Sequence, residues 1–469
     1  MVKKKHFQLV IYASVFLAFL LLGTFAGLHH EPWADEAQSW LIARDNNSLI
    51  DIIKAVRYEG TLPTWSLIIK LFQICGLDYD HIFVISLFFS AIGVILLLMS
   101  NSPESIKILL PFSFYTIFQN TVVARQYALV FPAMMLIVLF YKNRLFSPIK
   151  YYVSLIVLGL TSSYGIIISC SFMLWDFICM FNKKSSKNYD NRFRMCFYST
   201  AVIFLAMILA SFPPSDIGYV NTKISFIDSF STTFVFHIDN IVFQHIITIA
   251  VISSLCYYFK RNLFQFVIIF LPVSLYMAFF YHRLWHTCYL FYLVIILIIL
   301  LGEKREEKER VTTTNRARIA NMAIGSMLTL QCIAGLYSIY IDYAHPYNTA
   351  KTVSEFITPY VNSGASIDMY GYIAFGVQPY FNSNIFANYH SDKAYYVWST
   401  NNSLLKLSTP TSDLIISFAK NDDFEMSNFK DEIKDYKAYL FPGKMIFKFH
   451  PAENNDIYVL VKGGTKSTK

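Results

Sequence analysis

Two acidic side chains follow closely on the first apolar segment of the chain. Asp35 and Glu36 come a few residues after the apolar run 8–28, and Trp33 and Trp40 flank them. A carboxylate in such a place could be a general base that takes a proton from a hydroxyl group. The alternative is structural, because acidic residues stabilise the first turn of a helix and tryptophans anchor a helix at a membrane surface. The stretch alone leaves both interpretations open.

The two carboxylates lie near the predicted start of a short helix. Pro32 suits the first turn of a helix, and the residues after it recur at helical spacing. Ser48 can cap a second helix. The loop 29–81 is therefore expected to hold three short helices lying on the membrane, over residues 33–44, 49–57 and 62–76.

The composition is that of a polytopic membrane protein. Of 469 residues, 55% are hydrophobic and only 15% are charged, whereas ordinary soluble domains have about 25% charged residues. A membrane-spanning helix needs about 20 apolar residues. About eleven spans are expected, over residues 8–28, 82–100, 105–123, 127–141, 150–164, 165–181, 195–212, 241–259, 263–281, 285–302 and 318–341.

The distribution of charge sets the expected topology. If the chain crosses the membrane at these spans, most Lys and Arg residues of the loops lie on the same side as the N-terminus. Because cytoplasmic loops carry an excess of Lys and Arg, this side is expected to be cytoplasmic. This bias also explains the net charge of +8 without nucleic acid as a partner. The segment 62–76 is too short to cross, and the loop 211–240 is expected to be a partly apolar outer flap. A multi-pass protein of a bacterial inner membrane fits these features.

A change of composition marks a second domain. Residues 1–341 form the expected transmembrane domain, and residues 342–469 have nearly balanced charge with short apolar runs. Their pattern predicts a small extracytoplasmic α/β domain, with a helix over 350–361 and strands over 366–370, 413–417 and 457–461.

Polar clusters with aromatic residues between them occur on the predicted outer face, where ionisable groups usually mark a functional cavity. They hold Arg57 and Glu59; Arg125 and Tyr127; Tyr164; and His282, Arg283 and His286. Arginines at this depth can also be simple membrane anchors, and a histidine pair at this spacing is a weak metal signal. A carboxylate and several cations around one cavity fit glycosyl transfer from a lipid-phosphate sugar, in which a hydroxyl needs a base and a departing phosphate needs positive charge.

These residues resemble the GT-C superfamily of membrane glycosyltransferases, whose hallmark is a carboxylate in the first outer loop. Residues 125–129 (Arg-Gln-Tyr-Ala-Leu) look like a signature of bacterial members related to protein mannosyltransferases and to the aminoarabinose transferase of lipid A. Closer still is an uncharacterised bacterial group with the motif Glu-Pro-Trp-x-Asp-Glu-Ala-Gln-x-Trp, here from Glu31, followed by Arg-Tyr-Glu-Gly, here from Arg57. That group usually continues with His-Pro, whereas this chain has Thr61-Leu62-Pro63.

The resemblance implies roles for individual residues. Asp35 would be the catalytic base of an inverting displacement, and Glu36 a supporting acid or hydrogen-bond acceptor. Arg125, with Arg283 or His286, would bind the phosphate of a polyprenyl-phosphate sugar donor. The remaining substrate-binding candidates are Trp33, Tyr127, Arg57, Glu59 and Tyr164.

The acceptor would be a lipid, a glycan or a protein. No cofactor is expected. Some members of the superfamily need a divalent metal, but no second acidic pair in the outer loops supplies a site, so none is predicted.

Two other functions compete with this one. A lipid-linked sugar flippase or other transporter should carry polar residues at the middle of its spans, which are almost uncharged here apart from Asp176. A multi-spanning glycan polymerase would also use outer-loop arginines. The carboxylate in the first loop and the C-terminal domain argue against that class.

Overall fold

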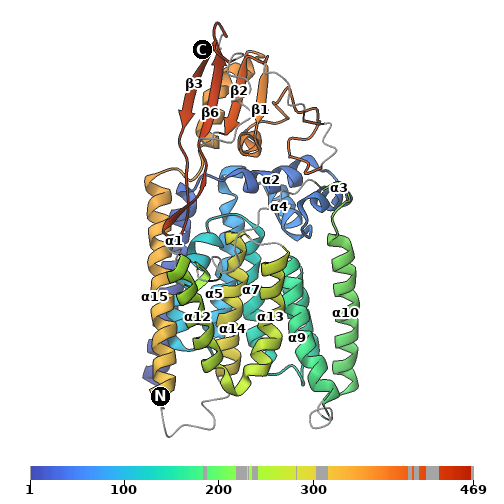
Figure 1. Ribbon diagram of the computed structural model, residues 1–469, viewed down its shortest axis with the longest axis vertical. Coiled ribbons are helices and arrows are strands. Elements are labelled where there is room, and N and C mark those ends of the chain that lie inside the picture. The colour runs from blue at the N-terminus through green and yellow to red at the C-terminus, as the bar shows by residue number, and fades with distance from the viewer. Residues whose placement is uncertain are drawn as a thin grey trace.

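The computed structural model consists mainly of helices, with a small mixed sheet near the C-terminal end (Figure 1). It describes residues 2–182, 187, 189–217, 230, 232–234, 241–280, 283–302, 315–399, 404–405, 411–418 and 433–465. His282, most of the expected flap 211–240 and most of the charged linker 303–318 lie outside these residues.

Seven helices of the described residues are long and apolar enough to cross a membrane. These stretches are His6–His29, Tyr79–Met99, Ser163–Phe181, Asn191–Ser211, Lys260–Phe279, Leu284–Leu301 and Met322–Ala344. Four shorter apolar helices are Thr64–Ile74, Gln126–Tyr141, Pro148–Gly159 and Val242–Tyr258. The structure thus confirms that the protein is mainly helical and has several helices that could cross a membrane.

The helices form a bundle around α14. In the apolar stretch of α14, 89% of the residues are buried, whereas in that of α1 only 22% are. Helix α14 is therefore central and α1 peripheral. The bundle helices are α1 (Val2–His29), α5 (Phe83–Met99), α7 (Val130–Tyr141), α8 (Pro148–Gly159), α9 (Ser163–Phe181), α10 (Asn191–Ser211), α12 (Ile241–Tyr258), α13 (Leu263–Phe279), α14 (Thr287–Gly302) and α15 (Asn315–Ala344).

The prediction of one continuous helix over 105–123 is wrong. The segment divides into α6 (Glu104–Leu109), a 3-10 turn (Leu110–Phe112) and a π-helical turn η4 (Phe114–Gln119). Pro111 lacks an amide hydrogen, and Ser113 has extended backbone angles, so the α-helix cannot continue. All six residues of η4 are buried. A broken helix is tolerated at membrane depth where protein surrounds it.

The three short helices expected after α1 are present as α2 (Ala34–Asp45), α3 (Leu49–Val56) and α4 (Thr64–Ile74). The Ser48 side chain caps α3 by accepting a hydrogen bond from the Asp51 amide, as predicted. Pro32 is not in the first turn of α2, because Trp33 is the N-cap residue. The two tryptophans of the motif are also not surface anchors: both are buried in the protein.

The C-terminal sheet has the strand order β1-β2-β6-β3. The predicted strands appear as β1 (Ile367–Tyr370), β2 (Leu414–Phe418) and β6 (Ile457–Lys462), and β3 (Tyr436–Phe441) was not predicted. β1 and β2 are parallel, and β6 is antiparallel to both of its neighbours. Helix α16 (Ala350–Asn362), also predicted, and the 3-10 segment η10 (Tyr372–Tyr380) share a core with the sheet. Figure 1 shows α2, α3 and α4 between this sheet and the bundle.

A β-hairpin of the C-terminal region packs into the helical bundle. Strands β4 (Lys444–Phe447) and β5 (His450–Asn454) pair outside the main sheet. The Phe447 ring lies 4.9 Å from the Phe114 ring and 5.2 Å from the Trp285 ring, measured between centroids. The region after residue 342 is therefore not separate from the bundle, since its hairpin forms part of the bundle core.

The turn between α8 and α9 leads to a first testable prediction. A Cβ atom on Gly165 would lie 2.1 Å from the Leu158 carbonyl oxygen, whereas a Cβ on Gly325 in α15 would meet nothing within 4 Å. We expect Gly165→Ala to destabilise the fold by about 1–3 kcal/mol, because the backbone must shift. Gly325→Ala should be neutral or slightly stabilising, because alanine favours helix. Thermal unfolding of the two purified variants measures the difference, and equal stability would contradict the packing of this turn.

Candidate functional site

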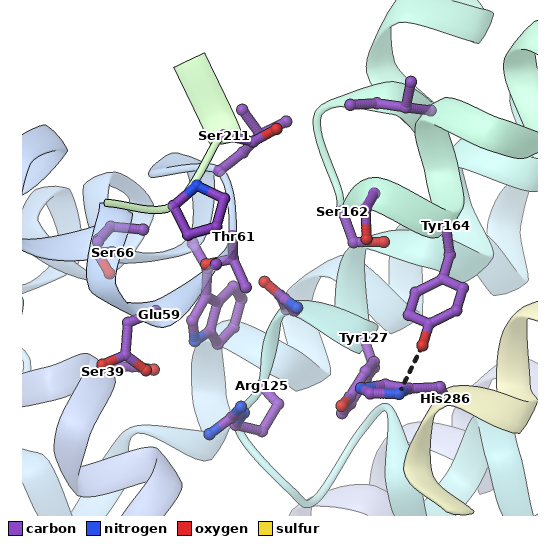
Figure 2. A pocket seen from close by; sticks show the side chains of 18 of the residues that line it. Ser39, Glu59, Thr61, Ser66, Arg125, Tyr127, Ser162, Tyr164, Ser211 and His286 are labelled. Carbon is purple, nitrogen blue, oxygen red and sulfur yellow. Dashed lines mark hydrogen bonds between the residues drawn. The ribbon is translucent and has the colours of Figure 1, made fainter. Parts of the chain in front are cut away.

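A cavity of about 650 Å³ lies beneath the short helices. Its lining comes from three parts of the chain: the loop that contains α2, α3 and α4, the segment around Arg125, and the facing ends of α9, α10 and α13 with the turn before α14. Figure 2 shows Glu59 and Ser39 on one side, Tyr164 and His286 on the opposite side, and Arg125 and Tyr127 between them. Apolar side chains complete the wall, among them Ile166, Ile167, Ile208, Phe212 and Tyr276. The cavity therefore combines polar walls with an apolar flank.

Asp35 and Arg125 form the ion pair at the edge of this cavity. The Arg125 Nη1 atom lies 2.8 Å from Asp35 Oδ2, and both side chains are partly exposed. Arg125 and Tyr127 line the cavity, whereas Asp35 faces a much smaller space of about 10 Å³ beside it, which Arg125 and Tyr127 also line. Arg125 thus connects the carboxylate to the cavity.

Glu36 lies beneath the ion pair and is fully buried. Its Oε1 accepts a hydrogen bond from the Ala124 amide at 2.5 Å, and its Oε2 accepts one from the Trp33 amide at 3.0 Å. Ala124 directly precedes Arg125, and Trp33 begins α2. Of the two roles considered for Glu36, the geometry fits the hydrogen-bond acceptor, which fixes the backbone on both sides of the Asp35–Arg125 pair.

His30 completes a buried charged network that the sequence did not reveal. Its Nε2 lies 3.1 Å from Glu36 Oε2, and its Nδ1 lies 2.8 Å from Asp342 Oδ2. Burial alone would lower the pKa of His30, but the charges of Asp342 and Glu36 together raise it to about 10. The histidine is therefore positively charged at neutral pH and joins the ends of α1 and α15 to α2.

Glu59 is the carboxylate that lines the large cavity. Its Oε1 accepts a hydrogen bond of 2.7 Å from the side-chain amide of Gln38 in α2. Burial raises the pKa of Glu59. The hydrogen bond from Gln38 and the charge of Arg125 lower it, but burial is the larger effect and the pKa is about 7. Glu59 can therefore exchange a proton near neutral pH.

On the opposite wall, His286 is fixed in one tautomer. The Arg283 backbone amide donates to His286 Nδ1 at 3.2 Å, so this nitrogen carries no hydrogen. The Tyr164 hydroxyl, 2.9 Å away, then donates to the same nitrogen (Figure 2). The ring hydrogen is consequently on Nε2, which makes this atom a donor for a negatively charged ligand.

Three of the predicted substrate-binding residues do not line the large cavity. Arg57 is exposed, and its guanidinium donates to the Phe212 carbonyl at 3.4 Å. Arg283 contributes its backbone amide to the orientation of His286, as described above. Trp33 lines the small space beside Asp35 and contacts Trp285, with ring centroids 6.4 Å apart.

Three residues that hold the site together were not predicted from the sequence: Gln38, His30 and Asp342. Gln38 is part of the first-loop motif, so its position was visible, but its contact with Glu59 was not. Asp342 is 312 residues from His30, and no local pattern connects them. Within the ranges that the structure describes, no three His, Cys, Asp or Glu side chains form a group suited to a metal ion.

No family model, no curated protein and no solved structure matches this chain. A proposal about the function therefore rests on the geometry of the cavity and on the resemblance of its motifs.

Proposed function

We propose that this protein is an inverting glycosyltransferase that moves a sugar from a polyprenyl-phosphate-linked donor to an acceptor hydroxyl. The observation that carries the proposal is the position of Arg125, which holds the Asp35 carboxylate and also lines a cavity with one apolar flank. A lipid-linked sugar phosphate needs these three features together: a base for the acceptor, a cation for the phosphate and an apolar surface for the lipid.

The donor would bind with its phosphate between the two polar walls. Arg125 offers several N–H donors in a planar fork, and His286 Nε2–H approaches from the other side of the cavity. Tyr127 lies between these two residues in the lining and would shape the sugar position. The apolar residues of α9, α10 and α13 would cover the first isoprene units.

In the reaction, Asp35 takes the proton of the acceptor hydroxyl as its oxygen attacks the anomeric carbon. The new bond from oxygen to carbon forms while the bond from carbon to the phosphate oxygen breaks, so the configuration at carbon inverts. Polyprenyl phosphate leaves with the electron pair, and the charge of Arg125 stabilises it. The guanidinium has five donors, so it can bind this phosphate while it remains beside Asp35.

The proposed topology adds four crossings to the seven long helices. These are the shorter apolar helices Gln126–Tyr141, Pro148–Gly159 and Val242–Tyr258, together with the broken segment of α6 and η4. With these eleven spans, the excess of Lys and Arg in the loops on the side of the N-terminus would make that side cytoplasmic, and the cavity and the C-terminal sheet would lie outside. The membrane would be a bacterial inner membrane, and the acceptor a lipid, a glycan or a protein at its outer surface.

A second prediction concerns the phosphate-binding cation. We expect Arg125→Gln to reduce transfer by about 10- to 100-fold, because a hydrogen-bonded charge is lost from the phosphate and from Asp35. Arg192→Gln is the matched control, since Arg192 is exposed at the start of α10, at the opposite end of this helix from its cavity-lining residues. Transfer is measured in membrane vesicles that hold equal amounts of each protein and are supplied with lipid-linked sugars extracted from the same cells.

The same assay separates the competing functions. A flippase moves the lipid-linked sugar across the membrane without breaking the bond to phosphate, so free polyprenyl phosphate would not appear. A polymerase would extend an existing glycan by several units rather than add one sugar. Release of one polyprenyl phosphate for each sugar transferred supports the proposal, and transport without this release rejects it.

A further inference from the structure

The side chain of Gln38 connects the C-terminal region to the cavity. Its Oε1 accepts a hydrogen bond of 2.9 Å from the Tyr396 amide, and its Nε2 donates to the Tyr396 carbonyl at 2.6 Å. The same Nε2 donates to Glu59 Oε1 at 2.7 Å. A single buried amide group therefore binds the backbone of the C-terminal region on one side and a cavity carboxylate on the other.

Other contacts hold α2 against the C-terminal region. Arg44 Nη1 donates to the Phe381 carbonyl at 2.7 Å. At the last residue of α2, Asp45 Oδ2 accepts from the Ala394 amide at 2.6 Å, and its carbonyl accepts from Lys393 Nζ at 2.8 Å. These contacts of α2 with the C-terminal region fix the position of Gln38. The hydrogen bond from Gln38 in turn fixes the position of the Glu59 carboxylate.

Glu59 lines the same cavity as Arg125, the residue proposed to bind the donor phosphate. It faces the wall of Tyr164 and His286, with Arg125 between the two walls (Figure 2). Among the described residues, the charge of Arg125 favours the ionised form of Glu59 and the charge of Asp35 opposes it. The Asp35 charge is balanced by Arg125, whereas ionised Glu59 adds negative charge to this wall of the cavity, which disfavours a negatively charged acceptor group there.

We propose that Glu59 binds the acceptor by accepting a hydrogen bond from an uncharged hydroxyl-bearing group, such as a neutral sugar, and that the C-terminal region positions Glu59 through Gln38. This inference rests on the proposed function. It gives the C-terminal region a part in the site: movement of the backbone at Tyr396 would change the orientation of the acceptor-binding carboxylate. Gln38 acts here as a positioning residue and does not touch the substrate.

The test is the pH dependence of transfer in the vesicle assay, because ionised Glu59 accepts the hydrogen bond and its pKa is near 7. The wild-type rate should fall on the acid side with a midpoint close to that value. Gln38→Leu removes a hydrogen bond that favours the ionised form, so the midpoint should move to higher pH. Glu59→Gln should lower the rate about 10-fold or more and abolish this acid-side step.

The matched control is Gln73→Leu. Gln73 in α4 also donates a hydrogen bond to α2, from its Nε2 to the Trp40 carbonyl at 3.1 Å. This variant loses a comparable contact with the same helix without losing the Gln38–Glu59 bond, so its midpoint should equal the wild-type value. An equal shift in Gln73→Leu and Gln38→Leu would mean that α2 has merely loosened, and would overturn the positioning role.

The outcomes also separate this inference from the proposed function. If Asp35→Asn abolishes transfer while Glu59→Gln keeps the wild-type rate and pH profile, only the role of Glu59 is rejected. If Asp35→Asn transfers sugar as well as the wild type, the proposed mechanism fails. If Gln38→Leu does not accumulate in the membrane, Glu59→Gln decides by itself, because glutamine has nearly the same shape as glutamate and requires no repacking.

Discussion

Replacement of Asp35 by asparagine is expected to reduce sugar transfer by about 10²- to 10⁴-fold, the usual contribution of a general base. Asparagine keeps the shape of the side chain but cannot take the proton of the acceptor hydroxyl. The Asp35 side chain is partly exposed and pairs with Arg125 at the edge of the cavity, so the fold should tolerate the change. The rate of polyprenyl phosphate release in vesicles measures the effect.

The control for this variant is Asp392→Asn. Asp392 is 84% exposed in its side chain, and it belongs to the C-terminal region outside the cavity lining. It should leave the rate unchanged at equal protein levels. A normal rate in Asp35→Asn would show that the carboxylate only stabilises the start of α2, and the base would have to be sought elsewhere.

The largest effect on stability is expected for His30→Ala. This change leaves the carboxylates of Glu36 and Asp342 buried and close together without their shared cation. Removal of one member of a buried charged network typically costs about 3–5 kcal/mol. Because Glu36 also holds the Ala124 amide, the position of Arg125 should be lost with the fold. Thermal unfolding in detergent measures the loss.

The neighbouring histidine provides the control for His30→Ala. His29 is exposed, and its Nδ1 bonds to the Phe25 carbonyl within the same helix, so His29→Ala should change the stability little. Equal unfolding temperatures for His30→Ala and the wild type would contradict the buried network.

The network also predicts how the stability of the wild type depends on pH. The pKa of His30 is raised to about 10 in the folded protein, against about 6.5 when unfolded. A raised pKa means that the folded state binds the proton more tightly, so this contribution is complete below about pH 6.5 and is lost as the pH rises through 10. The stability of the wild type should fall over this range, and the corresponding fall should be absent in His30→Ala.

Local signals were sufficient for the short helices of the first loop and for three strands. Ser48 marked the start of α3, and the apolar runs that became β1, β2 and β6 are buried in the C-terminal core. β3 was missed although Ala438, Tyr439, Leu440 and Phe441 form a short apolar run. The strand lies at the edge of the sheet, and its side chains are exposed or half-buried. Pro111 could have indicated a helix break, but the apolar residues around it led to the prediction of one continuous span.

The chemistry of the site could be anticipated only in part. Asp35 and Arg125 were both named, and the structure places them in contact, although 90 positions in the sequence separate them. The sequence left open whether Glu36 is a supporting acid or a hydrogen-bond acceptor, and it named Glu59 only as a substrate-binding candidate, because neither pattern shows how deeply the side chain is buried. Glu36 is fixed in a buried network with His30, whereas Glu59 faces the cavity. Such differences depend on contacts between distant elements and leave no pattern along the chain.

The measurement that tests the central claim most directly is the mass of surface glycans and glycolipids in cells that lack this gene. The gene is then restored either intact or as Asp35→Ala, at equal membrane levels. We predict that one sugar is missing in the deletion, that the intact gene restores it and that Asp35→Ala does not. The mass difference would identify the class of sugar. If Asp35→Ala restores the product as well as the intact gene does, the carboxylate is not the base and the transporter becomes the better explanation.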